Sequence, residues 1–189
     1  MTDARVLVIN GTVGVGKTTT AEIVAARWRD RGLPGAVVDV DELRRAWPAP
    51  ADDPFNARLG LANLAAVVAN DVRVGARRLV VADVLEDRAQ RDRQQQALQL
   101  PLTVVRLRAD PDLIRSRLTA RHRTDHDGGA ALAWHLERVL ELERILDRAE
   151  VDDAVVDVTE LDPPAAADAV LAAAGWSDDG STPASTGRP

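Results

Sequence analysis

A short glycine-rich stretch near the start of the chain constrains the fold more than any other feature. It reads Gly11-Thr12-Val13-Gly14-Val15-Gly16-Lys17-Thr18 and matches the pattern G-x-x-x-x-G-K-[ST] at every fixed position. A β-branched run, Arg5–Asn10, precedes it, and a helical pattern, Lys17–Arg31, follows it. Glycines let the backbone curl so that successive N–H groups point at a phosphate, and the helix N-terminus adds a favourable dipole. The stretch therefore predicts a phosphate-binding loop (P-loop) between a strand and a helix.

Lys17 is the only lysine of the chain, since the other basic residues are all arginines. A slim ammonium inside a tight loop performs a task that a planar guanidinium cannot. Lys17 is therefore expected to neutralise the β- and γ-phosphates of ATP, while the Thr18 hydroxyl ligates Mg²⁺. Thr19 and the backbone of residues 11–18 complete the predicted nucleotide site, whose cofactors are ATP and Mg²⁺.

Short β-branched runs alternate with longer helical patterns along the rest of the chain. The expected strands are Arg5–Asn10, Ala36–Val40, Arg78–Asp83, Leu102–Leu107 and Ala154–Val158. The expected helices are Lys17–Arg31, Glu42–Trp47, Phe55–Gly75, Gln90–Leu98, Asp110–His122, Ala130–Arg148 and Pro163–Ala174. This alternation predicts an α/β fold in which a five-stranded parallel sheet lies between two layers of helices. Ligands bind such folds beyond the carboxyl ends of the strands.

The length of 189 residues suits one domain, which we place at residues 1–175. Residues 176–189 are rich in serine, proline, glycine and aspartate, a composition that predicts a disordered tail.

Composition also restricts the possible partners. The net charge of −6 disfavours nucleic acid and anionic membranes, and the absence of cysteine excludes disulfides and thiolate metal sites. There is neither a signal-peptide pattern nor an apolar run long enough to span a membrane. A cytoplasmic protein is expected, and its oligomeric state is left open.

Acidic residues follow two of the expected strands. Asp83 ends the apolar run Leu79–Ala82, a pattern that places a carboxylate near the magnesium; the alternative is a strand-end cap or salt bridge. Asp39 and Asp41 lie at the end of the second strand, where a carboxylate can accept a proton from a substrate hydroxyl. We interpret Asp41 as the base, or alternatively as the N-cap of the next helix. Asp39 is interpreted as a supporting carboxylate on the substrate side or as an outer contact of the magnesium ion.

The segment around Asp41 resembles two families of kinases. Val40–Pro48, which reads Val-Asp-Glu-Leu-Arg-Arg-Ala-Trp-Pro, is similar to the segment that holds the catalytic aspartate of chloramphenicol phosphotransferase, with Asp41 in register. It also resembles the Asp-x-Leu-Arg segment of adenylylsulfate kinases, through Asp41, Leu43 and Arg44. The resemblance implies a P-loop kinase fold with Asp41 as the base and Arg44 on the substrate side.

Three further segments resemble these families more loosely. Arg88–Arg93 is similar to an arginine-rich segment of adenylylsulfate kinases, which implies that Arg88 binds substrate. Arg121 and Arg123 occupy the position of a short lid whose arginines assist the transfer in both families. Val156–Thr159 looks like the strand that ends at the adenine pocket, which implies that Thr159 contacts the nucleotide.

Asparagines recur every seven residues on the long helix expected at Phe55–Gly75. Asn56, Asn63 and Asn70 therefore lie along one face, and Asn63 is a candidate for the substrate cleft. A solvated helix face is the alternative interpretation.

Together these patterns predict a kinase that transfers the γ-phosphoryl group of Mg-ATP to a hydroxyl of a small molecule. The metabolite, nucleotide or antibiotic that accepts it is not identified by the sequence. The alternative is a nucleotide-dependent switch or regulatory ATPase with a protein partner. A GTPase of that class reads guanine with Asn-Lys-x-Asp, which cannot occur here because the only lysine lies in the phosphate loop.

Overall fold

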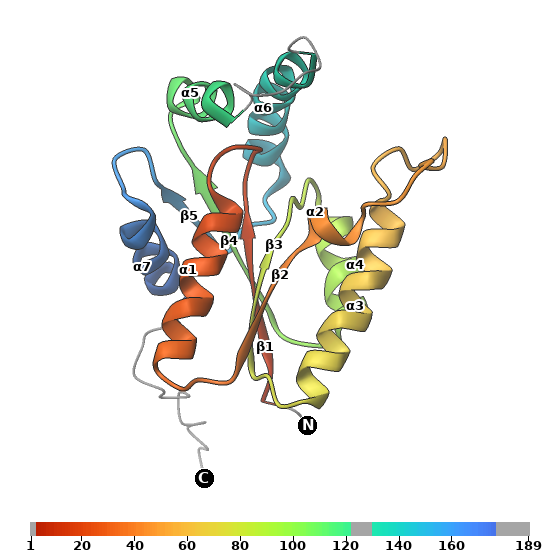
Figure 1. Cartoon of the computed structure of the whole chain (residues 1–189), viewed down its shortest axis with the longest axis vertical. Helices are drawn as coiled ribbons and strands as arrows, with labels where there is room; N and C mark the ends of the chain where they lie inside the picture. Colours follow the sequence, from red (N-terminus) through yellow and green to blue (C-terminus); the bar gives the residue numbers. More distant parts are fainter. Residues whose placement is uncertain (1–2, 122–129, 177–189) are drawn as a thin grey trace.

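The sheet at the centre of the molecule is five-stranded and entirely parallel, as the alternating pattern predicts. The structure, a computed structural model, describes residues 3–121 and 130–176. The strands lie in the order β2-β3-β1-β4-β5, so that β1, which leads into the phosphate loop, is central (Figure 1). Their bounds are β1 Arg5–Asn10, β2 Gly35–Asp39, β3 Arg78–Ala82, β4 Leu102–Arg108 and β5 Ala154–Asp157.

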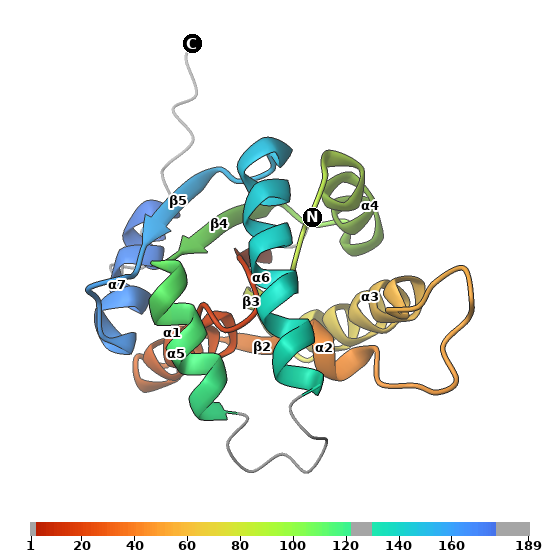
Figure 2. The same cartoon turned by 90° about the horizontal axis from the view of Figure 1, so that it is seen from above.

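Helices cover both faces of this sheet and also its carboxyl edge. α1 (Lys17–Asp30) and α7 (Pro163–Ala173) lie on one face, and α3 (Ala57–Arg73) and α4 (Arg88–Leu98) lie on the other (Figure 1). α5 (Pro111–Arg121) and α6 (Ala130–Ala149) stand above the carboxyl ends of the strands, as the view from above shows (Figure 2). The three-layer sandwich is therefore confirmed, with two helices placed over the edge where ligands bind.

Alternate residues of the central strands supply two separate cores. On β1, Leu7 and Ile9 belong to the core beneath α1 and α7, whereas Val6 and Val8 belong to the core beneath α3. All four side chains are completely buried, as expected of a parallel sheet covered on both faces. In the described part of the chain, no helix is both long and apolar enough to cross a membrane.

The second helix differs from its prediction. α2 spans Val40–Leu43 rather than Glu42–Trp47, because the Asp39 carboxylate accepts a hydrogen bond from the Asp41 N–H and so caps the helix early. The Asn56 side-chain amide donates to the carbonyl oxygens of Arg44 and Ala46, which satisfies carbonyls past the helix end without a further turn. The N-cap is therefore Asp39, and the alternative role considered for Asp41 is wrong.

The predicted end of the domain needs a correction of one residue. Trp176, assigned to the tail, is only 2% exposed and stacks on the buried Trp28 with ring centroids 5.7 Å apart. The Arg5 guanidinium lies 4.0 Å from the centroid of the Trp176 ring. Trp176 therefore belongs to the core, and the rest of the predicted tail, 177–189, lies outside the described residues.

We expect Trp176→Ala to lower the free energy of unfolding by about 3–5 kcal/mol, the usual cost of emptying a buried aromatic site. Urea denaturation followed by circular dichroism measures this loss. Trp47→Ala is the matched control, because Trp47 is 88% exposed and its replacement should change stability by less than about 0.5 kcal/mol. Equal stabilities of the two variants would contradict a core role for Trp176.

Candidate functional site

The phosphate loop owes its path to glycines that no other residue can replace without strain. Gly11 has φ 139° and Gly14 has φ 79°, values that side-chain-bearing residues rarely adopt. A Cβ atom on Gly11 would lie 2.7 Å from the Leu107 carbonyl oxygen, and one on Gly14 would lie 2.9 Å from Cγ of Leu118 on α5. The loop is thus pressed between β4 and α5 and ends at Gly16, the N-cap of α1.

Asn10 holds the first residue of this loop in place. Its side chain is completely buried, and its oxygen accepts hydrogen bonds from the N–H groups of Gly11 and Leu85. Its amide nitrogen donates to the Leu85 carbonyl oxygen and to the Asp152 carboxylate. One side chain therefore connects the end of β1 to the segment after β3 and to the approach to β5.

Lys17 and Thr18, the predicted ligands of phosphate and magnesium, meet different partners. The Lys17 ammonium donates to the Thr12 carbonyl oxygen at 3.0 Å. Burial lowers the pKa of this ammonium, and the charges of three nearby carboxylates, Asp41, Asp83 and Asp39, oppose that shift. The Thr18 hydroxyl donates to Oδ2 of Asp39 at 2.6 Å. The loop thus holds a desolvated cation beside an oxygen pair formed by Thr18 and Asp39.

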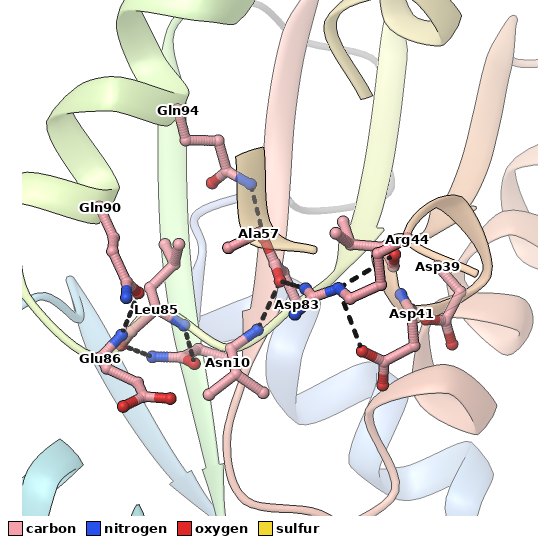
Figure 3. Close-up of polar contacts among 12 residues, drawn as sticks. Asn10, Asp39, Asp41, Arg44, Ala57, Asp83, Leu85, Glu86, Gln90 and Gln94 are labelled. Carbon is pink, nitrogen blue, oxygen red and sulfur yellow. Dashed lines mark hydrogen bonds and ion pairs between the residues drawn. The ribbon is translucent and has the colours of Figure 1, made fainter. Parts of the chain in front are cut away.

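Asp83 occupies a different environment from the other two carboxylates (Figure 3). Its Oδ1 accepts from the Arg44 guanidinium at 3.0 Å and from the Val84 N–H, and its Oδ2 accepts from the Gln94 amide. Burial raises the pKa of Asp83 to about 6, while the charge of Arg44 opposes that rise. Within the described residues, no hydrogen bond joins Asp83 to Thr18, and the carboxylate that contacts the Thr18 hydroxyl is Asp39.

A cavity of about 600 Å³ opens beside the phosphate loop. Lys17, Asp41, Arg44 and Asp83 line its charged part. Its apolar lining includes Phe55, Leu61, Leu64, Val84, Leu85, Trp134 and Leu142. A volume of this size suits a small molecule, and the lining combines apolar walls with a few convergent charges, as ligand sites do.

The donor set fits magnesium bound together with phosphate. Thr18 and Asp39 offer hard oxygen atoms, which Mg²⁺ prefers. Among residues 3–121 and 130–176, no three acidic or histidine side chains form a metal cluster. A magnesium ion here would therefore complete its coordination with phosphate oxygens and water, which is the usual arrangement for this ion at nucleotide sites.

Of the residues predicted to bind substrate or act as the base, some line the cavity and others do not. Asp41 and Arg44 lie together on the cavity wall, with the Arg44 Nε 3.6 Å from Oδ1 of Asp41. Asn63 is absent from that wall, and its amide donates to the Leu43 carbonyl oxygen, which ties α3 to α2. Arg88 forms an exposed ion pair with Glu150, outside the cavity lining.

Thr159, predicted to contact the nucleotide, follows β5 and links two loops. Its hydroxyl accepts a hydrogen bond from the Asp110 N–H, and its own N–H donates to the Asp157 carboxylate. The turn after β5 is thereby joined to the start of α5, at the carboxyl edge of the sheet.

Among the predicted lid arginines, only Arg121 can be located, and Arg123 lies outside the described residues. Arg121 is the exposed last residue of α5. Arg117, one turn earlier, instead reaches the phosphate loop and donates to the Val15 carbonyl oxygen at 3.0 Å. The close packing of Leu118 against Gly14 brings α5 near enough for this contact, and spacing along the helix alone did not distinguish Arg117 from Arg121.

Sequence reasoning missed the residues that form the rest of the cavity. Gln94 is buried although it lies on α4, a helix rich in arginine and glutamine. In the sequence, only its position one turn after Gln90 could have indicated a role at the site. Phe55 is the only phenylalanine in the chain, which was a usable signal for a special role. Trp134 and Arg138 face the cavity from α6, and nothing in the local pattern connected them with Phe55.

The raised pKa of Asp83 predicts a pH dependence of stability. Between pH 3.8, the ordinary pKa of an aspartate, and about pH 6, the pKa of Asp83 in the native protein, the native state holds a proton that the unfolded state has lost. Protonation of Asp83 therefore stabilises the native state fully below pH 3.8, and this stabilisation is lost as the pH rises through about 6. We expect the unfolding free energy of the wild-type protein, relative to Asp83→Asn, to fall by about 2 kcal/mol between pH 4 and pH 7. Urea denaturation at both pH values measures it.

The exposed Asp92 on α4 provides the control for this measurement. Asp92→Asn should keep the pH dependence of the wild-type protein. A difference between wild type and Asp83→Asn that stays constant over this pH range would contradict the shifted carboxylate.

Comparisons with known proteins agree with this architecture. No protein-family model matches the sequence, and no curated protein sequence matches it either. Solved structures do match. The tunicamycin resistance protein of Deinococcus radiodurans has a TM-score of 0.57 at 23% identity, covering 89% of this chain and 94% of that one.

Two kinases of known structure show the same likeness. A gluconokinase from Sinorhizobium meliloti has a TM-score of 0.55 at 21% identity, covering 93% of this chain and 94% of its own. The APS kinase of Mycobacterium tuberculosis, in complex with AMPPNP and APS, has a TM-score of 0.57 at 16% identity, covering 92% of this chain and 98% of its own. With its phosphate loop, parallel sheet and strand order, the chain has the fold of the P-loop small-molecule kinases.

Proposed function

We propose that this protein is an ATP-dependent kinase that phosphorylates a hydroxyl group of a small molecule. The observation that carries the proposal is that Lys17 of the phosphate loop and Asp41 line the same cavity of about 600 Å³. One side of that cavity is built for phosphate, and the remainder has room for an acceptor. The fold shared with a gluconokinase and an APS kinase supports the same reaction class.

Asp41 is better placed than Asp39 to act as the base. Both oxygens of Asp39 are engaged, one by the Asp41 N–H and the other by the Thr18 hydroxyl. The Asp41 side chain is 72% exposed and faces the cavity, with Arg44 as its neighbour. Asp41 would therefore accept the proton of the acceptor hydroxyl as the hydroxyl oxygen bonds to the γ-phosphorus and ADP leaves.

The remaining residues would bind the nucleotide and balance its charge. The backbone of residues 11–16, Lys17 and Thr18 would hold the phosphates, with Asp39 beside the magnesium. Bound Mg-ATP would supply the phosphoryl group and the metal charge that stabilises its transfer. Arg117, already on the phosphate loop, would add positive charge next to the transferring group. Arg44 would hold Asp41 in place while neutralising Asp83.

The cavity also favours the kinase over the alternative of a nucleotide-dependent switch. A switch has no acceptor molecule to bind, so room for an acceptor beside the phosphate loop supports the kinase. Stimulation of ATP turnover by a small hydroxylated molecule supports the kinase, whereas stimulation only by a protein partner supports the switch.

We expect Lys17→Ala to reduce phosphoryl transfer by at least about 100-fold, because it removes the cation that would lie beside the phosphates. The fold should persist, since among the described residues the Lys17 side chain makes a single hydrogen bond, to the Thr12 carbonyl oxygen of its own loop. ADP release in the presence of acceptor measures the loss, and circular dichroism checks the fold. Lys17→Arg should also be impaired, because a guanidinium does not fit the tight loop. Normal turnover by folded Lys17→Ala would refute the phosphate-loop assignment.

We expect Asp41→Asn to lower kcat by about 10²–10⁴, the range for general acid–base assistance. Stability should change little, because the α2 N-cap is the side chain of Asp39 and the Asp41 N–H remains. Glu42→Gln is the matched control: it removes a carboxylate from the same short helix, but one that pairs with Arg45 at the surface. Full activity of Asp41→Asn with an identified acceptor would show that Asp41 is not the base.

A further inference from the structure

One buried amide in the cavity lining has an unused hydrogen-bond acceptor. Gln94 lies on α4, is only 2% exposed and lines the cavity. Its amide nitrogen donates to Oδ2 of Asp83 at 2.9 Å, but its oxygen, Oε1, accepts no hydrogen bond from any residue that the structure describes. A buried acceptor without a partner is unfavourable, so its presence at a cavity indicates that a ligand supplies the missing donor.

The carboxylate of Asp83 decides which end of this amide is unused. An ionised carboxylate has no hydrogen to donate, so only the nitrogen of Gln94 can face it. Asp83 is itself held in place, because the Arg44 guanidinium and the Val84 N–H both donate to its other oxygen, Oδ1. The oxygen of Gln94 is therefore the end that remains for a ligand.

Gln94 and the proposed base lie at opposite ends of one row of polar side chains. The row, which Figure 3 shows, consists of Gln94, Asp83, Arg44 and Asp41, and all four line the cavity. Arg44 lies 3.0 Å from Asp83 and 3.6 Å from Asp41, so the two middle members pair with each other. The row thus ends in an exposed carboxylate on one side and a neutral acceptor on the other.

We infer that Gln94 determines the specificity of the kinase, because its Oε1 accepts a hydrogen bond from a second O–H or N–H group of the acceptor. This inference rests on the proposed kinase function. The reactive hydroxyl lies at Asp41, and the second donor lies at the other end of the row. An acceptor with an ether oxygen in place of that donor displaces water from Gln94 without replacing its hydrogen bond, and it is phosphorylated less efficiently.

Two flexible alcohols that differ in one donor test this inference. Hexane-1,6-diol and 6-methoxyhexan-1-ol both carry a primary hydroxyl, and only the diol can donate from its far end. Assays at pH 8 lie above the raised pKa of Asp83, about 6, so this carboxylate is ionised. Acceptor-dependent ADP release in Mg-ATP should give a kcat/KM per reactive hydroxyl about 10- to 100-fold higher for the diol. Equal values would overturn the inference while leaving the kinase function intact.

Paired variants of α4 locate the discrimination. Gln94→Met removes the acceptor but keeps the length of the side chain, and it should bring the diol-to-ether ratio of kcat/KM to within about 2-fold of unity. Any effect of this variant through Asp83 acts on both alcohols and cancels in the ratio. Gln95→Met is the matched control, because Gln95 is exposed and outside the lining, and it should keep the wild-type ratio. An unchanged ratio in Gln94→Met, folded by circular dichroism, would refute the role of Gln94.

Asp83→Asn tests the orientation of the Gln94 amide. Arg44 and Val84 both donate to the Oδ1 position, so the new amide keeps its oxygen there and turns its nitrogen to Gln94. Gln94 must then give its own oxygen to that nitrogen and offer N–H groups to the ligand, from which an ether accepts as well as a hydroxyl. The diol-to-ether ratio should fall by about 10-fold or more. A wild-type ratio in folded Asp83→Asn would overturn the inference.

Binding without turnover separates this inference from the proposed function. An NMR titration with Mg-AMPPNP present compares the affinities of hexane-1,6-diol and 6-methoxyhexan-1-ol directly. Tighter binding of the diol, lost in Gln94→Met, without any phosphoryl transfer in Mg-ATP would support the role of Gln94 and contradict the kinase. No binding of the diol, in the titration and in turnover alike, would overturn the inference.

Discussion

The buried amide of Asn10 holds together the parts on which the site depends. At the carboxyl end of β1 it binds the N–H of Gly11, both backbone groups of Leu85 and the carboxylate of Asp152. A buried amide with every group satisfied is rigid, because breaking any one bond would leave a desolvated polar atom. The start of the phosphate loop and the apolar cavity wall at Leu85 are therefore kept at a constant separation.

The charges of three carboxylates, Asp39, Asp41 and Asp83, act on the Lys17 ammonium, and the surroundings of each carboxylate suit it to a different task. Asp39 is held by the Thr18 hydroxyl and the helix that it caps, which suits an outer contact of magnesium. Asp83 accepts hydrogen bonds from Arg44 and Gln94, and its burial raises its pKa to about 6, so this carboxylate is suited to holding Arg44 in place. Asp41 alone remains exposed towards the cavity, where a base must meet its substrate.

The apolar side of the cavity depends on the position of α6. Arg106 is buried on β4 and forms ion pairs with Glu143 and Asp147 of α6, which hold that helix over the end of the sheet. Burial raises the pKa of Glu143, and the Arg106 charge opposes that rise. Because Trp134 and Arg138 lie on the same helix, this buried arginine also sets where the exposed ring faces Phe55.

The phosphate loop and the parallel sheet could be predicted from the sequence, because both depend on residues near one another in the chain: the glycines spaced before Lys17, and apolar runs that alternate with helices. The sequence could not predict that Thr18 bonds to Asp39 and not to Asp83. Both aspartates follow apolar strands, and only the hydrogen bond seen in the structure distinguishes them. The contact between the two aromatic rings could not be predicted from the sequence either. Phe55 and Trp134 are far apart in the chain, and their contact arises only when α6 packs across the edge of the sheet.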